Sequence, residues 1–406
     1  MAEIASARER FTFHGNLRDT RHGWLRLTPA YSVHWVREQL EECRGSRWPI
    51  LDPFSGTGTT LLASAELGLD CDAIDINPFL VWLARAKTGR YDRRSLDAAA
   101  RCVRAMARAA SGEGQRDPWI PPLYRIERWW ERDVLLALGR AFAVAKLRLK
   151  GADTRSRDLV LLAFCRALIG TANVSFGHQS MSFRNGNGKT RAAEAAHALE
   201  SAFEQLAAAA AKSLPRARQN VVCGDSRRTD KLLGSRRYFR IITSPPYPNR
   251  MSYIRELRPY MYWLGYLVER SDAGALDWAA IGGTWGSATS NLASWKPQGK
   301  TAIAFPGFER LVRRIGRKSP LLASYVNKYF HDMALHVRGL RRLVVPGGEV
   351  RYVVGNSKFY DVIVPAPEIF AAEFEAAGFC GASVAVLRKR TSKRELFEFV
   401  VSARQA

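Results

Sequence analysis

The chain has 406 residues, of which 47% are hydrophobic and 25% charged. This composition is globular and argues against a wholly disordered or collagen-like protein, while the length predicts two or three structural units or one large domain with insertions. The 62 Lys and Arg residues against 38 Asp and Glu give a net charge of +24. A field of this size attracts polyanions, of which nucleic acid is the leading candidate.

Apolar runs are too short to predict a membrane span. One of the longest apolar runs, LVLLAFC at 159–165, ends at Arg166. It is much shorter than the roughly 18 residues that a spanning helix needs. The N-terminal MAEIASARERFTF has no apolar core or cleavage pattern, so we expect a cytoplasmic protein. The six cysteines form no CxxC pair and the histidines no HExxH pattern, so we expect neither a disulfide framework nor a metal site.

Residues 48–75 have the pattern of a strand, a glycine turn, a helix and a second strand. The apolar run that ends at Leu51 leads into DPFSGTGTT and the helical stretch LLASAELG, and the next apolar run, CDAID, ends at Asp75. Such a βαβ unit is right-handed. It predicts an α/β fold with a mostly parallel twisted sheet and flanking helices.

The remaining elements follow in chain order. Alanine- and arginine-rich stretches over 93–218 predict a large helical insertion, with a polar loop at 175–190. Strand-like runs return at NVVCGD and YFRIITSPPY, and a helical segment follows to about residue 267. Residues 269–324 are predicted to be irregular and basic, and 325–406 to hold helices, a strand and an antiparallel C-terminal hairpin.

Asp52 and Asp75 each close a predicted strand, so both are expected at the ligand crevice of a doubly wound sheet. Gly56 and Gly58 allow a tight turn and close approach to a ligand. A carboxylate at the Asp75 position can accept hydrogen bonds from both ribose hydroxyls of an adenosine. An ordinary βα turn without a ligand is the alternative.

Two other nucleotide sites are disfavoured by the spacing. A dinucleotide-binding GxGxxG would need a third glycine where Leu61 stands, and a P-loop ending at 188–190 would need a glycine at Phe183.

A cytosine-C5 methyltransferase needs a nucleophilic cysteine, usually after a proline. The sequence contains no Pro-Cys pair.

The segment Ser244-Pro245-Pro246-Tyr247 follows an apolar strand-like run. Two prolines fix φ and remove two amide donors, which leaves rigid carbonyls that can accept hydrogen bonds from a base amine. Tyr247 would stack on an extruded base. A strand that ends in a diproline turn is the structural alternative.

With DPFSGTGTT first and TSPPY later, the sequence resembles the amino-methylating DNA methyltransferases that use S-adenosylmethionine, the cytosine-N4 and adenine-N6 group. The resemblance covers residues 20–92 and 219–268, and 325–403 more weakly. It implies a Rossmann-like class I methyltransferase fold. The SPPY form is similar to the cytosine-N4 branch, whereas adenine enzymes more often carry Asp or Asn at the Ser244 position.

The same resemblance implies roles for individual residues. Ser244 and the Pro245 carbonyl would orient the target amine, with Pro246 and Tyr247 completing the catalytic set. Asp75 and Asn77 would bind the ribose of the cofactor. The other implied cofactor contacts are Thr28, Asp52, Phe54, Gly56, Gly58, Thr59 and Asp225.

The chain is accordingly divided into five parts. Residues 1–92 would bind the cofactor, 219–268 hold the catalytic segment and 325–406 complete the methyltransferase domain. The insertions at 93–218 and 269–324 are candidates for target recognition and DNA contact, because they carry arginine, asparagine and lysine side chains suited to bases and phosphates.

We expect a monomeric enzyme that methylates the N4 amine of a flipped cytosine in double-stranded DNA, paired with a cognate restriction endonuclease. Adenine-N6 methylation by the same site is the first alternative, followed by methylation of an RNA base amine. From a different class, the chain could be a nucleic-acid-binding protein that retains the fold without methyl transfer.

Overall fold

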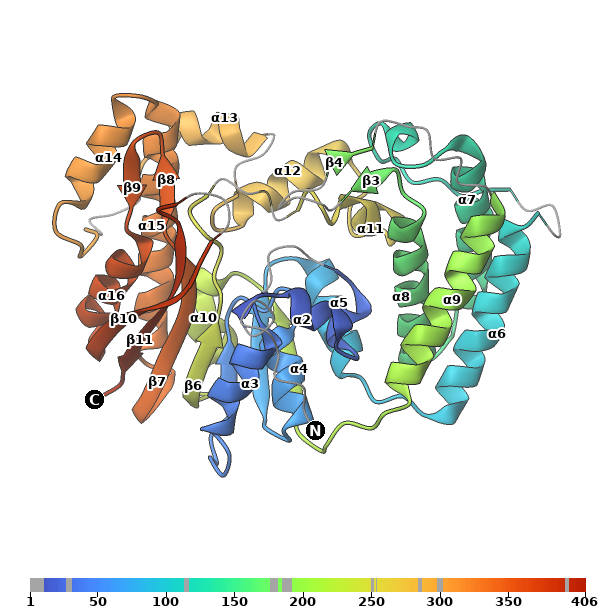
Figure 1. The fold of residues 1–406 in the computed structure, drawn as a ribbon, viewed down its shortest axis with the longest axis horizontal. Helices are drawn as coiled ribbons and strands as arrows, with labels where there is room; N and C mark the ends of the chain where they lie inside the picture. Colours follow the sequence, from blue (N-terminus) through green and yellow to red (C-terminus); the bar gives the residue numbers. More distant parts are fainter. Residues whose placement is uncertain are drawn as a thin grey trace.

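The computed structural model describes residues 11–26, 31–112, 117–175, 182–184, 192–249, 252, 254–283, 287–297, 302–390 and 394–406. Seven strands form one sheet in the order β10-β11-β7-β6-β1-β2-β5 (Figure 1). Their bounds are β1 Ile50–Asp52, β2 Cys71–Asp75, β5 Gln219–Cys223, β6 Tyr238–Thr243, β7 Val344–Gly355, β10 Cys380–Lys389 and β11 Phe397–Arg404.

The strand directions confirm the predicted Rossmann-like α/β fold. Strands β5, β2, β1, β6 and β7 are parallel neighbours, whereas β11 runs antiparallel to β7 and to β10. From β1 the chain first extends the sheet through β2 and β5 and then returns to place β6 on the other side of β1. Ligands of open α/β sheets bind at such a reversal, outside the carboxyl ends of the strands.

Helices cover both faces of the sheet. Successive strand residues point to opposite sides, and here both sides carry apolar side chains that are buried under helices. Ile50 packs into one apolar core and the next residue, Leu51, into the other. The first face carries α3 (Val33–Glu41), α4 (Thr59–Glu66) and α5 (Pro78–Thr88). The second carries α10 (Thr229–Leu233), α15 (Pro320–Leu340) and α16 (Ala366–Ala376).

Between α5 and β5 the chain forms the predicted helical insertion. Its helices are α6 (Arg93–Ala110), α7 (Arg132–Arg148), α8 (Thr154–Gly170) and α9 (Ala192–Ala210), with the 3-10 turn η2 (Ile126–Arg128) and the hairpin β3 (Val174–Ser175) and β4 (Ser182–Phe183). The core of the insertion continues into α11 (Arg258–Trp263), where the Trp263 ring contacts Trp130, Phe142 and Phe164. The insertion therefore packs against the segment that follows the diproline motif.

The prediction that residues 269–324 are irregular is wrong. They contain α12 (Arg270–Ala279), α13 (Ser287–Ser294) and α14 (Phe308–Gly316). A capping box between Glu269 and Asp272 starts α12, and α14 buries Phe308 and Ile315 beneath an arginine-rich outer face. Tertiary burial of a few apolar residues stabilises helices that the glycine- and serine-rich sequence obscures.

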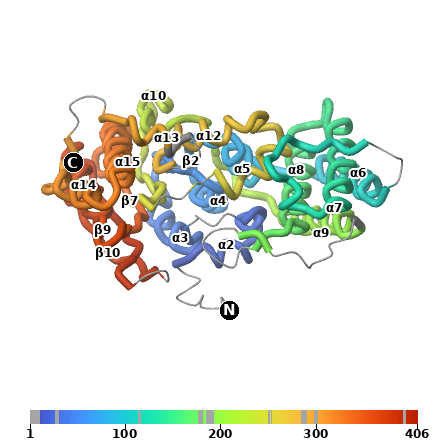
Figure 2. Tube along the Cα trace, turned by 90° about the horizontal axis from the view of Figure 1, so that it is seen from above, coloured from blue at the N-terminus to red at the C-terminus, as the bar shows by residue number. Residues whose placement is uncertain are grey.

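The remaining elements are short: α2 (His14–Arg18), η1 (His22–Trp24), η3 (Ser226–Arg228), and the hairpin β8 (Ser357–Phe359) and β9 (Val362–Val364). Two views at right angles place α6 and α7 at one end of the long axis and β10 and α14 at the other (Figures 1 and 2). None of the described helices is long and apolar enough to cross a membrane.

Candidate active site

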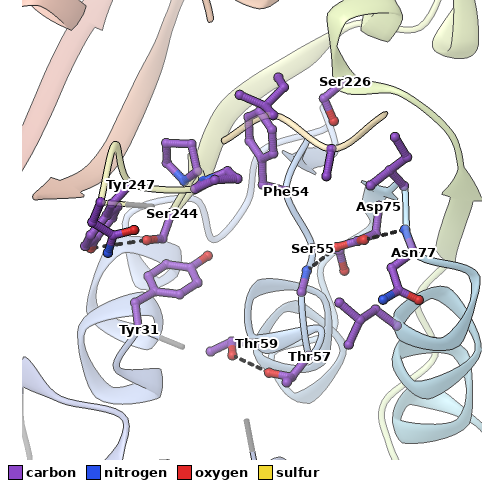
Figure 3. Close-up of a pocket in the computed structure, with 18 of the residues that line it drawn as sticks. Tyr31, Phe54, Ser55, Thr57, Thr59, Asp75, Asn77, Ser226, Ser244 and Tyr247 are labelled. Atoms are coloured by element: carbon purple, nitrogen blue, oxygen red, sulfur yellow. Dashed lines mark hydrogen bonds between the residues drawn. The ribbon is translucent and has the colours of Figure 1, made fainter. Parts of the chain in front are cut away.

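A cavity of about 230 Å³ opens where β1 and β6 end, at the reversal of strand order. Asp75 and Asn77 lie on one side of it and Ser244 and Tyr247 on the other, with Phe54 between them (Figure 3). The cavity thus joins Asp75 and Ser244, which are nearly 170 residues apart in the sequence. Its further lining residues include Phe13, Tyr31, Ser55, Gly56, Thr57, Thr59, Ile76, Leu80, Asp225, Ser226, Pro245, Pro246, Asn249, Ile254, Ala280, Ile281, Arg388, Arg390 and Glu398.

The two glycines of the first motif have different structural roles. Gly56 has a φ of +50° and its amide donates to Oδ2 of Asp75 at 2.8 Å, so the turn closes directly over that carboxylate. Gly58 has a φ of +77°, and a Cβ there would lie 2.9 Å from the Cβ of Ala84. Gly58 therefore permits α4 to pack on α5, and it does not line the cavity.

Asp75 lines the cavity at the end of β2. Its Oδ1 accepts a hydrogen bond from the amide of Asn77 at 2.8 Å. Burial raises the pKa of the Asp75 carboxyl to about 7, against these amide hydrogen bonds, which lower it. The Asn77 side chain accepts from the amide of Phe79 at 3.0 Å and caps α5, which begins with Pro78.

Asp52 is buried beneath the cavity and does not line it. Its Oδ1 accepts hydrogen bonds from the Thr243 hydroxyl at 2.6 Å and from the Phe54 amide at 3.1 Å. Burial raises the pKa of Asp52 to about 6. Because Thr243 ends β6, this carboxyl links the two strands that flank the reversal and holds their loops at a fixed distance.

Asp225 and Phe54 are two further residues that line the cavity. Asp225 pairs with Arg227 at 2.8 Å, and Arg227 pairs in turn with Asp332 on α15 at 3.0 Å. The Phe54 ring stands edge-on to buried His336, with 4.7 Å between the ring centroids. The two lining residues are thereby fixed by α15, a helix that the motifs did not predict to take part in the site.

Thr59 also lines the cavity, and its hydroxyl lies 3.5 Å from that of Thr57. Thr28 lies outside the described residues. The nearby Tyr31 is described and lines the cavity, and its hydroxyl contacts that of Thr60.

The diproline segment leaves β6 with its groups held from two sides. The Ser244 hydroxyl donates to the Val353 carbonyl of β7 at 3.0 Å and lies 3.4 Å from the hydroxyl of Tyr247. The Tyr329 hydroxyl of α15 donates to the Pro246 carbonyl at 2.6 Å. Within the described part of the chain no donor reaches the Pro245 carbonyl. Pro245 lines the cavity together with Ser244.

Tyr247 lies against Gly355, the last residue of β7. A Cβ at Gly355 would stand 2.9 Å from ring atoms of Tyr247, so only glycine permits this contact without a shift. The guanidinium of Arg390 lies 5.8 Å from the centre of the same ring. Burial keeps the pKa of the Tyr247 hydroxyl above its usual value, so the phenol stays neutral.

Residues of the C-terminal hairpin were missed by the sequence analysis. Arg388, Arg390 and Glu398 line the cavity from β10 and β11 and the turn between them. Their positions depend on the pairing of β11 with β7, which places Glu398 opposite Gly355. No local motif marks them, although the predicted hairpin carried a signal in its alternation of charged and apolar residues.

Within the described ranges, no group of three or more His, Cys, Asp or Glu side chains could hold a metal ion. The six cysteines are free thiols, and all of them are described. The polar side chains that line the cavity are carboxylates, hydroxyls, carboxamides and arginines, which can accept and donate hydrogen bonds to the hydroxyls and amine of a polar organic ligand.

Among solved structures, the rRNA methyltransferase aviRa from Streptomyces viridochromogenes aligns with a TM-score of 0.31, 13% identity and coverage of 99% of this chain and 96% of that chain. The strand order of the sheet, rather than this distant likeness, identifies the fold. No protein-family model matches the chain.

Curated relatives match shorter stretches. Type II methyltransferase M.BsoBI from Geobacillus stearothermophilus is 36% identical over 72 residues, 18% of this chain and 14% of that protein. M.MjaII from Methanocaldococcus jannaschii is 45% identical over 47 residues, 12% of this chain and 9% of that protein. M.AvaI from Nostoc sp. is 32% identical over 73 residues, 18% and 15% of the two chains. Although the matches span under a sixth of these relatives, they confirm that this chain resembles Type II methyltransferases.

Proposed function

We propose that the protein is an S-adenosylmethionine-dependent DNA methyltransferase that methylates the N4 amine of a flipped cytosine. The observation that carries the proposal is the shared cavity, in which the Asp75 carboxylate and the Ser244–Tyr247 segment face one space (Figure 3). A nucleoside cofactor and an extruded base can meet there.

The residues on the Asp75 side suit this cofactor. The Asp75 carboxylate accepts two backbone amides and still lines the cavity, where it would accept the ribose hydroxyls. Phe54, Ile76 and Leu80 offer apolar surface to a purine, and Asp225 lies beside them. When bound, S-adenosylmethionine supplies a methyl group already activated by its sulfonium.

The residues on the diproline side suit a base amine. The Ser244 hydroxyl and the Pro245 carbonyl would accept its N–H groups and turn the nitrogen lone pair toward the methyl group. As the nitrogen–methyl bond forms and the sulfur–methyl bond breaks, the amine becomes cationic and releases a proton to water. Tyr247, held on Gly355, would stack on the ring and fix its plane.

The division of the chain is part of the proposal. Residues 1–92, 219–268 and 325–406 would form the catalytic domain, while 93–218 and 269–324 would contact double-stranded DNA. The Type II relatives suggest a cognate restriction endonuclease acting on the same site. Free thiols suit a reducing compartment, so we place the protein in the cytoplasm, as a monomer.

The direct test is to incubate the purified protein with S-adenosylmethionine and unmethylated mixed-sequence DNA, digest to nucleosides and identify the product by mass spectrometry. N4-methylcytosine is the expected product. N6-methyladenine would keep the site and overturn the base assignment. Without any product on DNA, the same assay on RNA decides between an RNA enzyme and a protein that binds nucleic acid without transfer.

A further inference from the structure

Charged side chains of the C-terminal hairpin form the wall of the cavity beyond Tyr247. Arg388 pairs with Glu398 across β10 and β11, and Glu398 pairs with Gly355 of β7. Tyr247 packs on that same Gly355. The hairpin charges are therefore next to the ring on which the proposed function places the target base.

The two arginines of this wall are in different electrostatic situations. The Arg388 guanidinium is matched by Glu398, with distances of 2.7 Å from Nε to Oε2 and 2.8 Å from Nη2 to Oε1. No carboxylate lies within 4.0 Å of Arg390 in the ranges that the structure describes. The side chain of Arg390 donates to the Asn356 carbonyl at 3.3 Å, and a guanidinium has five N–H donors in all.

We propose that Arg390 donates to the acceptor edge of the target base and thereby selects cytosine over adenine at this site. The inference rests on the proposed function. With its N4 amine at Ser244, a cytosine presents N3 and then O2 along one edge, and both accept hydrogen bonds. An adenine with its N6 amine in the same place presents N1 followed by a C–H group, which accepts none.

The two bases differ in how many N–H donors of Arg390 they leave without an acceptor, and this difference selects cytosine. A guanidinium donates two parallel hydrogen bonds to adjacent acceptors, which adds geometric specificity to charge. Adenine would leave one N–H of Arg390 facing a C–H, and a hydrogen bond left unmade in this way is unfavourable. The Arg388–Glu398 pair lies alongside, so Glu398 does not neutralise Arg390 by direct contact.

The test compares Arg390→Gln with wild type in the nucleoside assay on mixed-sequence DNA. Arg394→Gln is the matched control, because Arg394 follows Arg390 by only four residues but is exposed and does not line the cavity. We expect Arg390→Gln to lower the rate of N4-methylcytosine formation at least tenfold and to raise the ratio of N6-methyladenine to N4-methylcytosine. The control should retain both, and calorimetry should give the same S-adenosylmethionine affinity for all three proteins.

A chemical variant of the base sharpens the test. Once the methylated position is mapped, a duplex with 3-deazacytosine at that position replaces the N3 acceptor by a C–H group and retains O2 and the exocyclic amine. Wild type should lose at least tenfold in rate on this duplex, whereas Arg390→Gln should lose little further. If Arg390→Gln unfolds, as judged by its melting temperature, Arg390→Lys retains the charge without the planar fork and should show the same pattern more weakly.

The outcomes separate this inference from the proposed function. If wild type methylates no base, the proposed function fails. If wild type forms N4-methylcytosine and Arg390→Gln behaves like Arg394→Gln, only the role of Arg390 is overturned. Equal losses from the deaza base in wild type and Arg390→Gln would also overturn it.

Discussion

At the scale of single residues, we expect Asp75 to make cofactor binding depend on pH. Its pKa is raised to about 7 because burial outweighs the amides of Gly56 and Asn77. Ribose hydroxyls donate more strongly to a carboxylate than to a carboxylic acid, so binding favours the ionised form. The affinity for S-adenosylmethionine should therefore rise with pH up to about 7 and level off above it.

This expectation can be measured by calorimetry between pH 5.5 and 8.5. Below pH 7 the dissociation constant should increase by up to about tenfold for each unit of pH. The amino group of the ligand also titrates in this range, so Asp75→Asn provides the reference. Its affinity should be weaker at pH 8 and should lack the acid-side loss, and a parallel loss in both proteins would contradict the assignment.

Tyr247 should act on the base and not on the cofactor. Tyr247→Ala removes the ring from Gly355 and should lower turnover by about 10- to 100-fold, the range expected when one stacking contact is lost. Tyr247→Phe keeps the ring and loses only the hydroxyl 3.4 Å from Ser244, so it should retain most activity. Cofactor affinity should be nearly unchanged in both variants, and an equal loss of affinity and turnover in Tyr247→Ala would refute the role.

At the scale of elements, each local sequence motif predicted the strands and the loop in which the motif lies. The glycine turn and its two acidic strand ends predicted β1, α4 and β2, because tight turns restrict the sequence to a few residue types. The predicted cofactor residues nonetheless divide by position. Asp75 faces the cavity, whereas Asp52 and Gly58 hold β6 and α5 in place. Spacing along the chain does not tell which side chains of a turn face the cavity and which are buried behind it.

The rest of the site depends on contacts between distant segments. Arg390 and Glu398 reach the cavity through the pairing of β11 with β7, and strand pairing over such distances leaves no local pattern. Tyr329 reaches the Pro246 carbonyl from α15, about 80 residues away in the sequence. The helices in 269–324 were missed because their stability comes from burial of a few apolar residues and not from helix propensity.

Arg21 links the helical insertion to the sheet. It is 2% exposed and donates to the carbonyl of Lys87 near the end of α5, at 3.1 Å. It also donates to the carbonyls of Ala210, the last residue of α9, and of Lys212 beyond it, at 3.0 and 2.8 Å. The carboxyl ends of helices carry partial negative charge, so a cation between two of them is favourable. One side chain thus fixes the angle between two helices that belong to different parts of the fold.

Arg21→Gln should destabilise the protein by at least about 2 kcal/mol, because several buried carbonyls lose their donors. Urea unfolding followed by circular dichroism measures the change. Arg90→Gln is the control, since Arg90 is exposed and donates to the single carbonyl of Pro215. If the two variants lose equal stability, the link between α5 and α9 does not depend on Arg21.

At the scale of the whole molecule, the net charge of +24 favours binding to any polyanion, and the arrangement of arginines around aromatic rings indicates where DNA would lie. Tyr124 is 55% exposed, and the guanidinium groups of Arg125 and Arg270 lie 5.3 and 5.1 Å from its ring centre. Arg125 comes from the helical insertion and Arg270 begins α12. The two insertions therefore meet at one cationic, aromatic surface.

If this surface contacts the DNA backbone, each arginine there releases about one counterion on binding. The double variant Arg125→Gln/Arg270→Gln should lower the slope of log affinity against log salt by about 2. Fluorescence anisotropy of a labelled duplex, titrated at several salt concentrations, gives this slope. Because the surface is separate from the cavity residues, the affinity for S-adenosylmethionine should not change.

The control double variant is Arg93→Gln/Arg155→Gln. It removes two exposed arginines of the helical insertion that already pair with carboxylates, so it should leave the slope near that of wild type. Identical slopes for the two double variants would show that the DNA lies elsewhere on the molecule.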